Sequence, residues 1–168
     1  MKILVISDSH GDAHSISRVA ALHADAELLL FLGDGLRDLG HVRDLLPSSM
    51  AVIAVSGNCD FFGVGVGVAR EEELLCFEGK RILACHGHRY GVKGGLSALI
   101  ASAHSKGVDV ALFGHTHTPH EQLDYDAREH RLQLFNPGSL GRSPDRKIHY
   151  GLLEIRENGV LFSAAVLV

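Results

Sequence analysis

The hydrophobic positions of the chain fall into short unbroken runs, and each run ends in a cluster of small and polar residues. The first run, Lys2 to Ile6, ends in Ser7-Asp8-Ser9-His10-Gly11, and later runs end in the same manner. A short apolar run without alternation predicts a strand covered on both faces, as in the middle of an α/β sheet. Ligand-binding groups collect at the carboxyl ends of such strands.

The first third of the chain predicts strands that alternate with helices. Asp12 is placed to cap the first helix, and Pro47 ends the second. The expected elements are strands over 27–32 and 50–55, after the first strand over 2–6, and helices over 13–24 and about 36–46. This part of the sequence therefore predicts a βαβαβ unit.

The rest of the chain is richer in hairpin patterns. Residues 61–69, rich in Gly and Val, are expected to be irregular. Hairpins are expected over 72–85, 122–135 and 147–168, a helix over about 94–105 and a strand over 109–113. We predict one domain over residues 1–168, of the α/β class, in which two mixed sheets pack face to face with helices outside. The exposed hairpins and the stretch 63–68 suggest a homodimer or higher homo-oligomer.

The composition predicts an ordinary folded protein, because 46% of the residues are hydrophobic and 21% are charged. A net charge of −4 argues against broad electrostatic capture of nucleic acid. No apolar stretch is long enough to span a bilayer, and Met1 leads directly into a strand without a visible signal peptide. Cys59, Cys76 and Cys85 are interpreted as reduced thiols, so we expect a cytoplasmic location.

Five predicted strand ends carry side chains that bind metals. These are Asp8 with His10, Asp34, Asn58, His86, and His115 with His117. Each alone is a weak signal, but a structural requirement does not explain all five together. Imidazole combined with carboxylate suits first-row divalent metals better than Ca²⁺ or Mg²⁺. The number of donors fits two ions if one carboxylate bridges them, and Asp34 is the natural bridge.

The motifs, taken in order, resemble those of the calcineurin-like metallophosphoesterases, and are most similar to the small YfcE-type phosphodiesterases. They are D-S-H (8–10), G-D (33–34), G-N-C-D (57–60), H-G-H (86–88), G-H-T-H (114–117) and N-P-G-S (136–139). The resemblance implies a four-layer αββα sandwich with a dinuclear centre. We expect two divalent ions, with Mn²⁺ preferred and Ni²⁺, Fe²⁺ or Zn²⁺ as alternatives.

The resemblance also implies an assignment of ligands. One ion would be held by Asp8, His10, Asp34 and His117, and the other by Asp34, Asn58, His86 and His115. The expected reaction is hydrolysis of a small phosphodiester, in which a hydroxide bridging the two metals attacks phosphorus in line with the leaving oxygen. Asn58 contributes a neutral oxygen that preserves Lewis acidity. His88, two residues beyond a ligand, is the candidate for a general acid or for a residue that orients a ligand.

Some positions leave the details open. Cys59 stands where the wider superfamily usually has histidine, although G-N-C-D is normal for the YfcE-like group. Neither Arg142 nor Arg146 aligns cleanly with the arginine expected to contact substrate. The backbone N–H groups of residues 136–139 are candidates for phosphate binding. Asp60 is expected to cap a helix rather than to orient a ligand.

The remaining histidines are assigned surface or structural roles, apart from His120, which is expected at the rim of the site. They are His14, His23, His41, His104, His130 and His149. Two other functions stay open. A phosphomonoesterase would use the same centre, and a non-catalytic scaffold like the retromer subunit would share the fold. The scaffold predicts degraded ligand motifs, whereas every ligand type is intact here.

Overall fold

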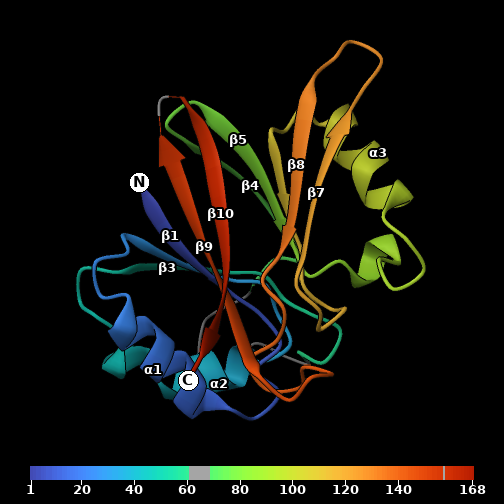
Figure 1. The fold of residues 1–168 in the computed structure, drawn as a ribbon. Helices are drawn as coiled ribbons and strands as arrows, with labels where there is room; N and C mark the ends of the chain where they lie inside the picture. Colours follow the sequence, from blue (N-terminus) through green and yellow to red (C-terminus); the bar gives the residue numbers. More distant parts are fainter. Residues whose placement is uncertain (61–68, 157) are drawn as a thin grey trace.

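The computed structural model describes residues 1–60, 69–156 and 158–168. In this part of the chain the strands form two five-stranded sheets (Figure 1). The first sheet contains, in spatial order, β10 (Gly159–Leu167), β9 (Ile148–Arg156), β1 (Lys2–Ile6), β2 (Leu28–Phe31) and β3 (Ala51–Ala54). Its three N-terminal strands are parallel, and β9 joins β1 in antiparallel orientation.

The second sheet is also mixed. It contains, in order, β4 (Glu72–Phe77), β5 (Lys80–Cys85), β6 (Val110–Leu112), β8 (Arg131–Asn136) and β7 (His120–Tyr125). The central strands β5, β6 and β8 are parallel, and an antiparallel hairpin partner flanks them on each side. Both predicted hairpins of this sheet are confirmed, and so is the prediction of two mixed sheets.

Helices cover the outer faces of both sheets (Figure 1). They are α1 (Ala13–Leu22), α2 (Leu36–His41) and α3 (Ser97–Ser105), with short 3-10 turns η1 (Arg43–Leu45) and η2 (His88–Tyr90). One buried cluster packs α1 and α2 on the first sheet, and another packs α3 on the second. The four-layer αββα order is therefore confirmed. No helix of the described residues combines the length and apolarity needed to cross a membrane.

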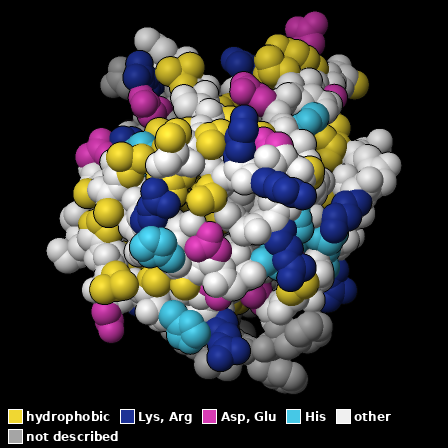
Figure 2. All heavy atoms as spheres, turned by 60° about the horizontal axis from the view of Figure 1, so that its bottom comes forward, with side chains coloured by type: hydrophobic (Ala, Val, Ile, Leu, Met, Phe, Trp, Pro, Cys, Tyr) yellow, Lys and Arg dark blue, Asp and Glu magenta, His cyan; other side chains and the backbone are white. Residues whose placement is uncertain are grey.

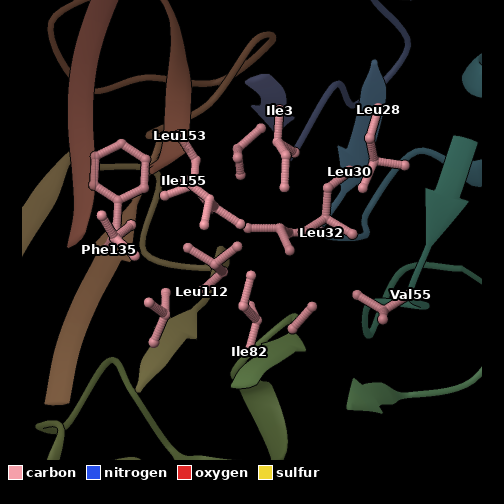
Figure 3. Packing of buried hydrophobic residues seen from close by; sticks show 14 residues of the cluster. Ile3, Leu28, Leu30, Leu32, Val55, Ile82, Leu112, Phe135, Leu153 and Ile155 are labelled. Atoms are coloured by element: carbon pink, nitrogen blue, oxygen red, sulfur yellow. The ribbon is translucent and has the colours of Figure 1, made fainter. Parts of the chain in front are cut away.

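The sheets pack face to face through a third cluster of buried side chains. Ile3, Leu30 and Leu153 from the first sheet face Ile82 and Leu112 from the second (Figure 3). Because the strands are short and apolar on both faces, each also contributes to an outer cluster. An unbroken hydrophobic run in the sequence thus reflects a strand that is covered by the opposite sheet on one face and by helices on the other.

The second predicted helix is shorter than its pattern suggests. It ends at His41, and the chain continues as the turn η1, which leaves Leu45 68% exposed. Gly40 weakens the helix near its end, and Pro47 prevents its extension. Residues 61–68, for which irregular structure and a contribution to oligomer contacts are expected, lie outside the described residues.

Parallel strands fix where the polar loops lie. The loops that follow β1, β2 and β3 leave the first sheet at one edge, and those that follow β5 and β6 leave the second sheet in the same way. Within each edge the backbone joins neighbouring loops: Asp8 N–H donates to the Gly33 carbonyl, and Gly114 N–H to the His86 carbonyl. Between the two edges, His115 N–H donates to Asp8 Oδ2 at 3.0 Å. Polar side chains far apart in the sequence therefore meet between the sheets.

Truncation of the inter-sheet core tests this packing. Leu30→Ala is expected to lower the free energy of unfolding by about 2–5 kcal/mol, because Leu30 is fully buried and its loss leaves a cavity. Leu161→Ala, at a position 55% exposed, is the matched control and is expected to change stability by less than about 0.5 kcal/mol. Urea denaturation measures both, and equal effects would contradict the packing described.

Candidate metal centre

The ends of β1 and β6 place one group of donors together. It consists of Asp8, His10 and His117, each with one ligand atom within 4.8 Å of the others. The Nε2 atoms of His10 and His117 are 3.2 Å apart. Asp8 Oδ1 lies 3.2 Å from His117 Nε2 and 3.6 Å from His10 Nε2.

A second group lies beside it, built from the ends of β2, β5 and β6. It contains Asp34, His86 and His115. His86 Nε2 lies 3.3 Å from Asp34 Oδ2 and 3.1 Å from His115 Nδ1. His10 Nε2 is 3.8 Å from the same Asp34 oxygen, so this carboxylate lies between the two groups. His115 and His117 are separated only by Thr116 but belong to different groups.

The rings of His86 and His117 are oriented by the backbone. His86 Nδ1–H donates to the Leu32 carbonyl at 2.7 Å, and His117 Nδ1–H donates to the Arg142 carbonyl at 3.0 Å. In the neutral form of each imidazole, this bond fixes the tautomer whose lone pair lies on Nε2. Both lone pairs then face the cluster, as is typical of imidazoles that bind metal.

The unsatisfied atoms of the cluster fit divalent cations. Asp8 Oδ1 is buried, and no described residue is aligned to donate a hydrogen bond to it. The imidazole nitrogens of His10 and His117 face each other at hydrogen-bonding distance, as do those of His86 and His115. An unpartnered buried oxygen is costly in isolation, and a cation bound beside it would satisfy it together with the nearby imidazole nitrogens.

The charge state of the cluster also suits a cation. Burial opposes ionisation of Asp8 and Asp34, but hydrogen bonds and imidazole charge outweigh it. The pKa of Asp8 lies well below its usual range, and that of Asp34 falls to about 2. Burial, followed by the charge of His86, lowers the pKa of His115 to about 4. Near neutral pH the cluster therefore holds ionised carboxylates and a neutral His115 imidazole.

Backbone strain is concentrated at these residues. In the described chain eight non-glycine residues have positive φ, and five of them are the predicted ligands Asp8 (56°), His10 (45°), Asp34 (58°), His115 (68°) and His117 (61°). Left-handed conformations are unfavourable for residues with a Cβ and persist where the surrounding structure imposes them. The sharp turns at the strand ends aim these side chains into the space between the sheets.

Asp60 holds the loop of Asp34 in this conformation. Its carboxylate accepts the backbone N–H groups of Asp34, Gly35, Leu36 and Gly57 at 2.8–2.9 Å. Since α2 begins at Leu36, Asp60 caps this helix from a distant position in the sequence, as predicted. Through the Asp34 N–H it also orients a predicted ligand, so the two roles are not alternatives. Gly57 is required beside it, because a Cβ there would collide with Asp34 Oδ1.

Sequence reasoning missed Asp38, which supports the first turn. Its Oδ2 accepts Ser9 Oγ–H at 2.6 Å and Gly11 N–H at 2.7 Å, and the residue is buried. An acidic residue between the apolar positions Leu36 and Leu39 of a predicted helix was the available signal. The partners were not predictable, because they lie on a different loop.

The N-P-G-S loop has a structural role, and the expectation that its N–H groups bind phosphate stays a prediction. Gly138 N–H donates to Asn136 Oδ1, and the N–H groups of Leu140 and Gly141 donate to the carbonyls of Ser7 and Asp8. Asn136 Nδ2 in turn donates to the Gly114 carbonyl at 2.8 Å. The loop uses these groups to tie β8 to both ligand turns.

The two residues predicted as catalytic lie at the margin of the cluster. The His88 ring is 5.4 Å from that of His86, its Nδ1 is buried without a partner among the described residues, and burial lowers its pKa. The Asn58 side chain is exposed and donates to Cys59 Sγ at 3.3 Å. It reaches the cluster through its neighbour, since Cys59 N–H donates to Asp34 Oδ1 at 2.7 Å.

Cys59 itself is a protonated thiol near neutral pH. Burial and the adjacent Asp34 raise its pKa to about 11, against a smaller opposite effect of Arg142. The sulfur lies within 4.8 Å of ligand atoms of His10 and Asp34. A thiol in this state is a weak nucleophile, although the residue is exposed rather than packed in the core.

The model of the calcineurin-like phosphoesterase superfamily domain matches residues 1–158. The chain belongs to this superfamily. One relative is YsnB of Bacillus subtilis (strain 168), a probable metallophosphoesterase. The two sequences are 33% identical over 141 residues, which are 83% of this chain and 75% of YsnB.

Solved structures agree with the fold of this phosphoesterase. An archaeal phosphodiesterase matches with a TM-score of 0.77 and 21% identity over 99% of this chain and 100% of the other. YfcE, a phosphoesterase from E. coli, matches with a TM-score of 0.64 and 24% identity over 92% of this chain and 88% of the other. Vps29 from Entamoeba histolytica, complexed with Zn²⁺, matches with a TM-score of 0.69 and 22% identity over 99% of both chains. At these identities the likeness establishes the fold alone.

Replacement of Asp60 tests the support of the phosphoesterase centre. Asp60→Ala leaves four backbone N–H groups without their charged acceptor, so the free energy of unfolding is expected to fall by at least about 2 kcal/mol. Asp60→Asn retains one oxygen acceptor and is expected to lose less. Thermal unfolding and metal content measure the effect. Stability and metal content equal to those of the wild type in Asp60→Ala would contradict the role described.

Proposed function

We propose that this phosphoesterase hydrolyses phosphodiesters with two divalent cations bound at the strand-end cluster. The observation that carries the proposal is the pair of three-residue donor groups with Asp34 between them. Two such groups side by side match the requirements of a dinuclear centre, in which one carboxylate is shared. Mn²⁺ is the proposed ion, as the resemblance to the YfcE-type phosphodiesterases implies, with Ni²⁺, Fe²⁺ or Zn²⁺ as alternatives.

The proposed ligands divide between the two cations. Asp8, His10, Asp34 and His117 would hold one, and Asp34, Asn58, His86 and His115 the other. When bound, such cations lower the pKa of coordinated water towards neutrality and stabilise charge on phosphoryl oxygens. The Asn58 carboxamide lies one residue from the Cys59 N–H that contacts Asp34, and a rotation of its exposed side chain would bring its oxygen to the second group.

The protein's own residues favour an anionic substrate at the mouth of the cluster. The positive charge of Lys93 acts on His115, and that of Arg142 acts on Cys59, so cationic side chains flank both donor groups. Figure 2 shows Lys and Arg side chains beside His and acidic side chains on the face that it presents. Of Arg142 and Arg146, we therefore propose Arg142 as the phosphate contact, because its carbonyl accepts His117 Nδ1–H at the first donor group.

The chain offers only weak proton donors for the leaving group. Cys59 occupies the position where a histidine is common in the wider superfamily, and its raised pKa makes it a poor proton donor. His88 lies beside the second donor group, with its ring centroid 6.2 Å from that of His115, and is proposed to position a phosphoryl oxygen or the leaving group. Substrates with good leaving groups are therefore expected to react best.

The decisive experiment compares a diester with a monoester. The protein is stripped with a chelator, reloaded with Mn²⁺, and assayed with bis(p-nitrophenyl) phosphate and p-nitrophenyl phosphate. The reloaded protein is expected to hydrolyse both esters in a metal-dependent reaction and to prefer the diester. Preference for the monoester would support the phosphomonoesterase, which uses the same centre.

A scaffold is the second candidate, because the Vps29 fold is shared at a TM-score of 0.69. The intact donor groups favour catalysis over this candidate. Absence of metal-dependent turnover with either ester, in a protein that binds the metal, would favour the scaffold.

Removal of single ligands tests the centre directly. His117→Ala and Asp34→Asn are each expected to lower turnover at least about 100-fold and to reduce bound metal, because each removes a donor and leaves others unpaired. His14→Ala, an exposed histidine on α1, is the matched control and should retain both. Wild-type turnover and metal content in either ligand variant would refute the assignment.

A further inference from the structure

A second cluster of metal-binding side chains lies away from the strand ends. It is formed by His104 in the last turn of α3 and by Asp126 and His130 in the turn between β7 and β8. β7 starts near the N-P-G-S loop and runs six residues to this turn, so about 17 Å of strand separates the two places. In Figure 1 the turn is at the top of the β7–β8 hairpin, beside α3.

The His104 imidazole is oriented as a metal ligand would be. Its Nε2–H donates to Asp124 Oδ2 at 2.7 Å, which leaves a lone pair on Nδ1. That Nδ1 is buried and has no hydrogen-bond partner among the described residues. A carboxylate that holds one imidazole nitrogen while the other stays free is the usual arrangement behind a metal-bound histidine.

Asp126 offers a fixed and ionised carboxylate. Its Oδ1 accepts the backbone N–H groups of Arg128 and His130 at 2.8 and 2.9 Å, whereas no described residue donates to its Oδ2. These backbone hydrogen bonds lower the pKa of Asp126. The turn therefore presents one carboxylate oxygen whose direction is set by the backbone.

His130 completes the group. Its Nε2 lies 3.7 Å from Asp109 Oδ1, and its ring packs edge-on against that of His104 with centroids 6.1 Å apart. His104, Asp126 and His130 each offer one donor atom, and these three atoms lie within 4.8 Å of one another, as in both groups of the strand-end cluster. A tetrahedral Zn²⁺ separates its ligand atoms by about 3.3 Å, so small side-chain movements close the site.

We propose that His104, Asp126 and His130 bind a first-row divalent cation of the type that prefers imidazole, such as Zn²⁺, with Asp124 holding the His104 ring and Asp109 beside His130. Two imidazoles and one carboxylate match the ligand preferences of such ions. Three protein ligands leave one position to water. The bound ion ties the end of α3 to the β7–β8 hairpin, and the proposal does not depend on the reaction at the strand ends.

Zinc stoichiometry tests this site. Wild type, His104→Ala and Asp126→Asn are stripped with a chelator, loaded with Zn²⁺, passed through a desalting column and analysed for zinc per chain. Each variant is expected to hold one Zn²⁺ fewer than wild type. Asp126→Asn is the sharper variant, because its amide oxygen still accepts the backbone N–H groups while the Oδ2 ligand is lost. Asp124→Asn is expected to weaken Zn²⁺ binding about 10- to 100-fold.

The matched control is His120→Ala, which removes an exposed histidine from the same hairpin and is expected to hold as much zinc as wild type. Equal zinc in wild type and both ligand variants, or an equal loss in His120→Ala, would overturn the proposal. If a variant fails to fold in the chelator, anomalous scattering from zinc-soaked wild-type crystals decides: a peak among the three side chains supports the site, and its absence refutes it. Ester turnover tests the strand-end cluster separately.

Discussion

Two ionised carboxylates buried between the sheets are the constraint on which this structure depends. Asp8 and Asp34 are almost fully buried, and a buried charge is costly unless it is paired and hydrogen-bonded. Here imidazoles and backbone N–H groups surround both carboxylates, yet one oxygen of Asp8 remains without a donor. The arrangement is complete only with positive charge between the two groups, so the same feature that strains the fold creates an affinity for cations.

The support for these carboxylates explains much of the loop structure. Asp60 and Asp38 accept backbone N–H groups that would otherwise be unsatisfied at the turns, and the N-P-G-S loop ties the first strand to β8. Each support comes from a different part of the chain. The positive φ angles at the predicted ligands persist because several hydrogen bonds hold each turn. The parallel strands supply the rigid base from which these turns project.

The two histidine clusters show that similar residues serve different ends of the fold. At the strand ends, imidazoles are oriented by backbone carbonyls and face shared carboxylates. At the α3–hairpin contact, Asp124 orients His104, Asp109 lies 3.7 Å from His130, and both imidazoles lie near a carboxylate fixed by its own turn. The second arrangement is more exposed and offers three donors, and the ion proposed there would link α3 to the β7–β8 hairpin.

The sequence by itself determined the elements, because unbroken apolar runs of strand length and polar stops report burial directly. It also determined which residue types stand at the strand ends, and so the likeness to calcineurin-like phosphoesterases. What the tertiary structure decided was pairing across distance. That Asp60 caps α2, that Asp38 holds the turn of Ser9, and that His104 meets Asp126 depend on which loops touch. Local sequence carries no record of such contacts, because they form only when the sheets and helices have packed.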